Sequence, residues 1–199
     1  ATPIPRTLHM SLLKIRDMSL LTTPPHNRQP IETVVDEYTD DKIAVAIRRE
    51  IERGGQVFYL HNRIESLSEI RSKLEKIVPE VLIDVAHGQM SSNELDDIFH
   101  RFKMGGFHVL ISTTIIENGI DIPNVNTIII DRADMYGVSQ LYQLRGRVGR
   151  GTSKSQCILI SDSDAERLKI MEKVDDGFEI SEEDFKLRGH GDLFGTKQS

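Results

Sequence analysis

The sequence predicts an α/β domain built on a mostly parallel β-sheet with helices on both faces. Short runs that are apolar at every position, as in strands buried on both faces, alternate with segments whose apolar residues recur at helical spacing. This alternation is typical of β-α-β units. The chain of 199 residues is long enough to bury a core without disulfide bonds, and its single cysteine, Cys157, lies in an apolar run where a buried thiol is expected.

Strands and helices are expected to alternate from residue 31 onward. Strands are predicted at 31–38, 56–60, 81–86, 109–112, 127–131 and 156–161. Helices are predicted at 40–53, from 64 to Pro79, from 91 to Gly105, at 138–145 and after Ser163. Two of these helices begin with Ser-x-x-Glu, a pattern in which the serine caps the first turn.

The two ends of the chain depart from this pattern. Residues 1–30 are predicted to be an N-terminal linker, because prolines gather toward its end. Residues 175–199 are expected to form an appendage to the sheet domain of residues 31–174, because a short acidic helix there is followed by a glycine-rich stretch. The chain starts at Ala1 without a methionine, so we expect it to be a piece of a longer protein.

The composition excludes several other classes. Hydrophobic residues make up 38% and charged residues 28% of the chain, which is the balance of a globular protein. No apolar run approaches the roughly 20 residues that cross a membrane, and no secretion signal is visible, so a cytoplasmic location is expected. The net charge of −6 does not by itself indicate a nucleic-acid-binding protein.

The segment 140–150 (QLYQLRGRVGR) is the strongest functional signal. Arg145, Arg147 and Arg150 are closely spaced, and with Lys154 they form a cationic cluster without an acidic residue between them. Guanidinium groups bind phosphate oxygens in pairs, and the interleaved glycines let the backbone approach an anion. A solvated basic loop is the alternative interpretation.

A second polar segment, 112–124 (STTIIENGIDIPN), follows a predicted strand. Loops at the carboxyl ends of parallel strands are where ligands bind in such sheets. Thr113 and Thr114 offer hydroxyls that suit a nucleic-acid backbone, and Asp121 offers an acceptor for a ribose hydroxyl. The alternative is a plain turn in which Gly119 and Asp121 serve only the backbone geometry.

In this order, the two segments resemble motifs V and VI of the superfamily 2 helicases and translocases. Residues 1–6 resemble the end of motif III, residues 56–67 resemble motif IV, and residues 86–90 (AHGQM) resemble the block that follows it. The resemblance implies a RecA-like fold, the fold of the P-loop NTPases, as the second lobe of a two-lobed motor.

Within that superfamily, the segments FYLHNRIESL and STTIIENGIDIPNVNT resemble the transcription-repair coupling factor family. Residues 188–198 resemble the translocation motif that this family shares with the RecG family. In both families this motif belongs to a helical hairpin, so residues 175–199 are expected to hold a truncated part of it.

The resemblance implies the second motor lobe of an ATP-dependent double-stranded DNA translocase, which couples DNA repair to transcription by displacing stalled RNA polymerase. The implied partners are double-stranded DNA, the first RecA-like lobe of the same parent chain, and RNA polymerase and nucleotide-excision-repair proteins through other domains. Two alternatives stay open. One is a RecG-like fork-reversal helicase lobe, and the other is a non-catalytic nucleic-acid-binding domain with a RecA-like fold.

The resemblance also implies roles for individual residues. Arg147 and Arg150 would be the arginine fingers for ATP hydrolysis, with Gln143 beside them in the catalytic set. The nucleotide-binding residues would be Glu117, Gly119 and Asp121. The DNA-binding residues would be Arg63, His87, Gly88, Gln89, Thr113 and Thr114, and a relay of movement would use Arg188 and Gln198.

No G-x-x-x-x-G-K-[ST] phosphate cradle occurs in the chain, so ATP and Mg²⁺ are expected to be held mainly by the first lobe. The fingers of one lobe would then reach a nucleotide on the other, and the isolated chain is expected not to hydrolyse ATP. The seven histidines show no metal-ligand spacing, so no metal site is expected within this chain.

Overall fold

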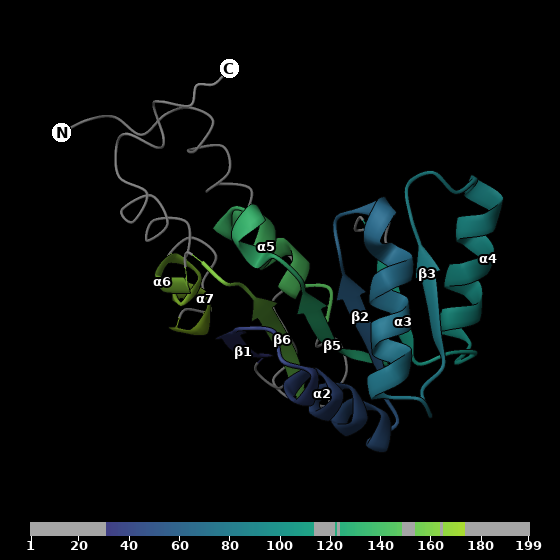
Figure 1. Ribbon diagram of the computed structural model, residues 1–199, viewed down its shortest axis with the longest axis horizontal. Coiled ribbons are helices and arrows are strands. Elements are labelled where there is room, and N and C mark those ends of the chain that lie inside the picture. The colour runs from purple at the N-terminus through teal and green to yellow at the C-terminus, as the bar shows by residue number, and fades with distance from the viewer. Residues whose placement is uncertain (1–30, 114–121, 123, 149–153, 164, 174–199) are drawn as a thin grey trace, which may run out of the picture.

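The computed structural model describes residues 31–113, 122, 124–148, 154–163 and 165–173, which form an α/β domain around a six-stranded sheet (Figure 1). The strands are β1 (Ile31–Asp36), β2 (Gln56–Leu60), β3 (Ile83–Ala86), β4 (Val109–Ser112), β5 (Val125–Ile130) and β6 (Ser155–Ile160). Their order is β1-β6-β5-β2-β4-β3, and every pair is parallel. The predicted parallel sheet of an α/β domain is therefore confirmed.

The helices cover both faces of the sheet. They are α2 (Asp40–Glu52), α3 (Leu67–Ile77), α4 (Ser92–Lys103), α5 (Val138–Arg145), α6 (Ala165–Leu168) and α7 (Ile170–Lys173), with 3-10 turns at Ile64–Ser66 and Ala133–Met135. Along the chain, α2 to α5 lie between strands, whereas α6 and α7 follow β6. Helices α2 and α3 pack on one face, whereas α4 and α5 pack on the other. The helix that we predicted after Ser163 is in fact two short helices, α6 and α7.

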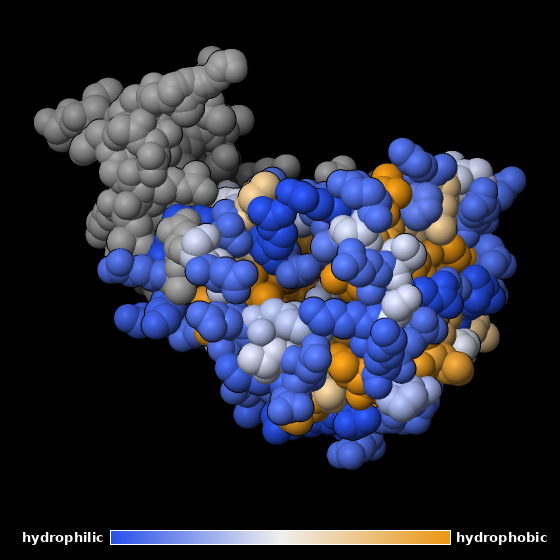
Figure 2. Space-filling model, in the orientation of Figure 1, coloured by the Kyte–Doolittle hydropathy of each residue, from blue (hydrophilic) through white to orange (hydrophobic). Residues whose placement is uncertain are grey.

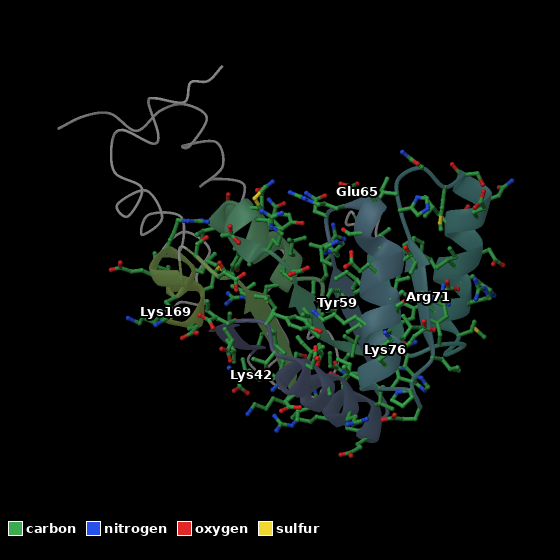
Figure 3. The ribbon with its side chains drawn as sticks, viewed as in Figure 1. Lys42, Tyr59, Glu65, Arg71, Lys76 and Lys169 are labelled. Atoms are coloured by element: carbon green, nitrogen blue, oxygen red, sulfur yellow. The ribbon has the colours of Figure 1, made fainter. Side chains whose placement is uncertain are left out.

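The core is divided into two layers by the sheet, because successive side chains of a strand point to opposite faces. On β5, Ile128 and Ile130 join the layer under α4 and α5, and Ile129 joins the layer under α2 and α3. Tyr59 of β2 is 1% exposed, and Figure 3 shows it among the strands at the centre of the domain. Cys157 is fully buried in the layer under α5, as we predicted.

Capping side chains determine where two helices begin. The Thr39 hydroxyl accepts a hydrogen bond from the Lys42 N–H at 3.2 Å and caps α2, which begins at Asp40, the predicted start. The Ser91 hydroxyl accepts from the Glu94 N–H at 3.1 Å, which confirms the predicted cap of α4. Gly54 follows α2 with φ of 82°, a left-handed conformation that favours glycine.

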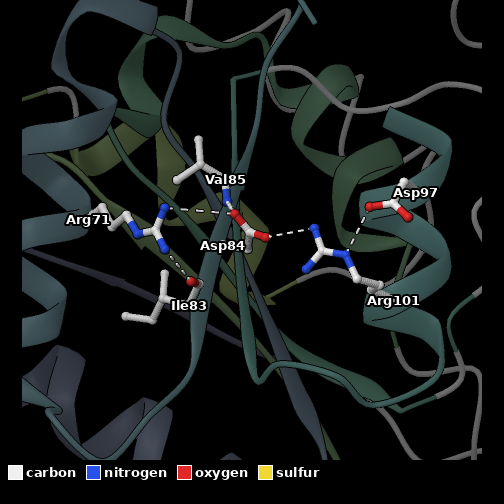
Figure 4. Close-up of polar contacts among 6 residues, drawn as sticks. All are labelled: Arg71, Ile83, Asp84, Val85, Asp97 and Arg101. Atoms are coloured by element: carbon white, nitrogen blue, oxygen red, sulfur yellow. Dashed lines mark hydrogen bonds and ion pairs between the residues drawn. The ribbon is translucent and has the colours of Figure 1, made fainter. Parts of the chain in front are cut away.

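Both edge strands of the sheet have outward-facing backbone groups that are bonded to side chains. On β3, Arg71 Nη2 donates to the carbonyl of Ile83 at 3.0 Å, and Asp84 Oδ1 accepts from the Val85 N–H at 2.8 Å (Figure 4). Arg101 Nη2 of α4 also donates to Asp84 Oδ2 at 3.0 Å, which joins α4 to this edge. These contacts occupy hydrogen-bonding groups that would otherwise be open to pairing with another strand.

On the opposite edge, the N–H of Val35 in β1 donates to Glu172 Oε1 of α7 at 2.7 Å. The face drawn in Figure 2 is mainly hydrophilic, with hydrophobic side chains scattered over it. The large hydrophobic side chains that are more than half exposed come from separate elements: Val45, Leu82, Met104 and Met135. None of the helices in the described ranges is long and apolar enough to cross a membrane.

Candidate nucleic-acid and nucleotide interface

The carboxyl ends of the strands meet at one edge of the sheet, because all of the pairs are parallel. In spatial order, β5, β2, β4 and β3 are neighbours, and the arrowheads of β5 and β2 mark this edge in Figure 1. The residues that follow these strands are Asp131, His61–Arg63, Thr113 and His87–Gln89. The structure therefore brings Arg63, Thr113 and the 87–89 segment, all predicted to bind DNA, to one edge.

His61 is the central polar residue of this edge. It follows β2, is 6% exposed, and places Nδ1 2.7 Å from Asp131 Oδ2 at the end of β5. Its Nε2 lies 2.5 Å from the hydroxyl of Ser66 in the turn before α3. The imidazole therefore joins the ends of two neighbouring strands to the loop that follows β2.

The loop of residues 61–66 presents Asn62 and Arg63 to solvent, since both are exposed. The Ser66 N–H donates to the carbonyl of Arg63 at 3.4 Å and closes a turn behind these two residues. Figure 3 shows Glu65, from the same loop, at the end of α3 that adjoins this edge. The predicted DNA-contact residue Arg63 is thus on an accessible tip.

Thr113 is largely buried at this edge. It is 5% exposed, and its backbone N–H donates to the carbonyl of Ala86 at 3.3 Å. Its hydroxyl is buried and has no hydrogen-bond partner among the described residues. An unpaired buried hydroxyl costs free energy unless a group outside the described ranges or a ligand satisfies it.

The segment after β3 forms an open turn. The Met90 N–H donates to the carbonyl of His87 at 3.1 Å, and the Gln89 N–H donates to His87 Nδ1 at 3.2 Å. Gly88 and Gln89 are exposed, and a Cβ added to Gly88 would meet no atom within 4 Å. The turn therefore leaves its backbone accessible to a ligand.

Tyrosines surround the Asp131 carboxylate. Burial raises the pKa of the Tyr59 hydroxyl well above its ordinary value, and the negative charge of Asp131 adds to that effect. Burial and the same carboxylate also raise the pKa of Tyr136. The Asp131 carboxylate therefore lies near the phenol groups of both tyrosines, and its bond to His61 gives it a polar partner.

Helix α5 carries the segment that we predicted to contain the arginine fingers. The Gln140 side chain accepts from the Gly137 N–H at 2.9 Å at the start of the helix. Val138, Leu141 and Leu144 are buried against the sheet. Their spacing leaves Gln143 half-buried on another side of the helix.

Arg147 follows the end of α5 and is also half-buried. Its backbone N–H donates to the carbonyl of Leu144 at 3.0 Å. Its guanidinium makes no hydrogen bond or ion pair within the part of the chain that the structure describes. A charged group in this condition is open to an anionic partner.

The predicted cationic cluster is corrected by the structure at two of its members. Arg145 is 5% exposed, and its Nη1 donates to the Thr33 hydroxyl at 3.0 Å and to the Met171 carbonyl at 2.9 Å. Lys154 forms an ion pair with Glu32 at 3.4 Å. Arg145 points inward because it lies next to Leu144 on the buried side of α5, and it therefore supports the fold.

Seven predicted site residues lie outside the described residues: Thr114, Glu117, Gly119, Asp121, Arg150, Arg188 and Gln198. Among the residues that are described, no group of three or more His, Cys, Asp or Glu side chains is arranged to hold a metal ion. The prediction from sequence did not include Ser66 or Asp131 in the site and gave no role to His61. His61 and Asp131 are polar residues directly after buried strands, and that position could have indicated them from the sequence.

The all-parallel sheet, the polar edge and the arginine-rich segment that begins in α5 define the second RecA-like lobe of a helicase-type motor. Residues 39–152 match the family model for the helicase conserved C-terminal domain, and the chain therefore belongs to this family. The chain is 48% identical over its whole length to the transcription-repair-coupling factor of Myxococcus xanthus and 46% identical to that of Staphylococcus haemolyticus. The resemblance to the coupling factor family that we inferred from the sequence is confirmed.

A solved structure of RecG bound to a three-way DNA junction is also similar. It is 35% identical, matches with a TM-score of 0.71, and covers 97% of this chain and 27% of the RecG chain. The present chain spans only 17% of the Myxococcus protein and 18% of the Staphylococcus protein. The similarity therefore concerns one lobe of much longer proteins.

Proposed function

We propose that this chain is the second motor lobe of an ATP-dependent double-stranded DNA translocase that couples DNA repair to transcription by displacing stalled RNA polymerase. The observation that carries this proposal is the similarity of the whole chain to transcription-repair-coupling factors. Contacts with RNA polymerase and with excision-repair proteins would be made by domains outside this chain.

In this proposal, Arg147 and Arg150 act on ATP as arginine fingers, with Gln143 beside them. The guanidinium of Arg147 makes no bond to any of the described residues, which supports this role, since a finger must be free to reach a phosphate. Glu117, Gly119 and Asp121 would contact the nucleotide from this lobe. The absence of a phosphate cradle from the sequence agrees with a nucleotide held mainly by the first lobe, where ATP would supply the γ-phosphoryl group and Mg²⁺ would neutralise its charge.

The DNA would lie along the carboxyl edge of the sheet. Arg63, the turn at 87–89 and the threonines at 113 and 114 would contact phosphates, which carry little sequence information and so suit movement along any duplex. Residues 175–199, with Arg188 and Gln198, would form part of a hairpin that relays movement to the DNA. Closure of the two lobes around ATP would then change the spacing of their DNA contacts.

The finger assignment is tested in the full-length protein that carries this lobe. We expect Arg147→Ala and Arg150→Ala each to lower the DNA-stimulated ATPase rate by about 10³-fold, the lower end of the effect of a finger. Arg49→Ala is the matched control, because Arg49 is an exposed arginine of α2 on the other face of the sheet. Undiminished turnover in the Arg147→Ala and Arg150→Ala variants would show that the finger assignment is wrong.

A RecG-like fork-reversal activity is the second candidate, and the TM-score of 0.71 to the RecG structure favours it. The two activities use the same lobe and differ in their substrates. The full-length protein should release RNA polymerase stalled on a linear template if the first proposal holds. Regression of a model fork without release of polymerase would instead support the second candidate.

A further inference from the structure

We propose that the side chains of Asp131, His61 and Ser66 form a tie that holds the 61–66 loop in the shape that presents Arg63 to a DNA phosphate. His61 and Ser66 are then positioning residues. This inference rests on the proposed function, because it deepens the DNA contact assigned to Arg63.

The tie connects three separate elements. Asp131 follows β5, His61 follows β2, and Ser66 ends the 3-10 turn before α3. The distances are 2.7 Å from His61 Nδ1 to Asp131 Oδ2 and 2.5 Å from His61 Nε2 to Ser66 Oγ. Both ring nitrogens are therefore engaged, which fixes the rotation of the imidazole.

The chemistry of these groups determines the direction of one bond. A carboxylate oxygen accepts a hydrogen bond, so Nδ1 of His61 donates to Asp131. Nε2 of the same ring faces the Ser66 hydroxyl, which is also 3.5 Å from the carbonyl of Arg63. Each member thus has a defined partner, as a buried polar network requires.

The base of the loop is anchored to the sheet by its backbone as well. The His61 N–H donates to the carbonyl of Ser112 at 2.9 Å, and the Asp131 N–H donates to the carbonyl of Leu60 at 2.9 Å. The beginning of the loop is therefore fixed to β4 and β5, and the bond to Ser66 also fixes its far end. Only Asn62, Arg63, Ile64 and Glu65 lie between the two fixed ends.

The orientation of the loop side chains affects DNA binding because the loop carries both a positive and a negative charge. Arg63 and Glu65 cancel, so the loop has no net attraction for phosphate, and binding depends on which of the two side chains faces the DNA. The carbonyl of Arg63 is held by the Ser66 N–H at 3.4 Å, so the position of Ser66 constrains the backbone of Arg63 directly. A preformed loop also lowers the entropy lost when Arg63 binds.

The test measures duplex DNA binding by the full-length protein over a series of salt concentrations. Each phosphate contact contributes about 0.9 to the slope of log K against log salt concentration. We expect Arg63→Ala to lower the magnitude of the slope by about 1. Ser66→Ala and His61→Gln, which break the tie at either side, should do the same and weaken binding roughly fivefold at fixed salt.

Two further variants separate positioning from general loss of stability. Thr127→Val is the matched control. Thr127 lies on β5, the strand that Asp131 follows, and its hydroxyl makes a buried bond to Glu50 away from the carboxyl edge. This variant should lower the melting temperature and leave the salt slope unchanged. The double variant of Arg63→Ala with Ser66→Ala should bind DNA no more weakly than Arg63→Ala alone, because the two substitutions remove the same contact, that of Arg63 with a phosphate.

The outcomes distinguish this inference from the proposed function. A slope that falls in Arg63→Ala but stays unchanged in both Ser66→Ala and His61→Gln would overturn the tie and leave the DNA contact in place. A slope that is unchanged in Arg63→Ala would overturn the DNA contact itself. Equal loss of slope in Thr127→Val would show that the effect is general destabilisation, and this too would overturn the tie.

Discussion

The guanidinium of Arg145 donates to the hydroxyl of Thr33 at 3.0 Å inside the domain, although it lies in the arginine-rich segment that the sequence marks as a phosphate site. Arg147, only two residues further along, makes no such bond to any described residue. Arg145 is the last residue of α5, whereas Arg147 lies past the end of the helix, so the two guanidinium groups face different environments. The end of the helix therefore separates a structural arginine from the one that we propose as a finger.

Replacement of Arg145 should destabilise the domain. Arg145→Met would leave the Thr33 hydroxyl and the Met171 carbonyl without a donor, and we expect a loss of about 2–4 kcal/mol from the free energy of unfolding. The control Arg147→Met should change that free energy by less than about 0.5 kcal/mol. Urea unfolding followed by circular dichroism measures both values, and equal losses would contradict the structural role of Arg145.

Gly55 should tolerate no side chain. A Cβ at this position would lie 1.9 Å from Glu50 Oε2, and Glu50 is fully buried and held by Arg53 at 2.7 Å. We expect Gly55→Ala to cost about 1–3 kcal/mol, because the carboxylate must move away from its partners. Gly88→Ala is the control, since its Cβ would meet open space, and thermal unfolding compares the two.

The β3 edge should become a site of self-association when Arg71 is removed. Arg71→Ala frees the carbonyl of Ile83, and we expect a faster rise in light scattering on heating at high protein concentration. Arg48→Ala is a close control, because Arg48 also binds a carboxylate, Glu80, and a main-chain carbonyl, that of Ile77, but at a helix end. Equal aggregation of the two variants would contradict protection of the edge.

Cys157 should react slowly with thiol reagents. Burial raises the pKa of its thiol from 9.0 to about 12, although the nearby Arg145 opposes this shift. At pH 8 we expect labelling to be at least about 100-fold slower in the native protein than in urea, because the thiol must first be exposed and ionised.

The same shift predicts a dependence of stability on pH. The folded state keeps a proton on Cys157 that the unfolded state loses, so this contribution is complete below about pH 9 and disappears as the pH rises toward 12. Between pH 9 and 12, the midpoint of urea unfolding should therefore fall less steeply with pH for Cys157→Ala than for the unsubstituted protein. Identical pH profiles for the variant and the unsubstituted protein would contradict the raised pKa.

Much of the fold followed from local patterns in the sequence. Ile43 and Ile47 recur at helical spacing and became the buried side of α2, and the Ser91 cap starts α4 as expected. The strand ends were less exact, since β1 stops at Asp36 instead of residue 38. There the Asp36 carboxylate accepts from the Glu37 N–H at 2.9 Å and pairs with Lys42, which turns the chain.

The sequence alone determined the class of this protein, because strand and helix periodicity and the motif order are properties of neighbouring residues. Only the tertiary structure decided which polar residues act together. His61 and Asp131 are 70 residues apart and meet because β2 and β5 are adjacent in the sheet. Likewise, Arg145 is buried because β1 and α7 pack against the end of α5, and the free energy of such contacts depends on distances in space that residue order does not specify.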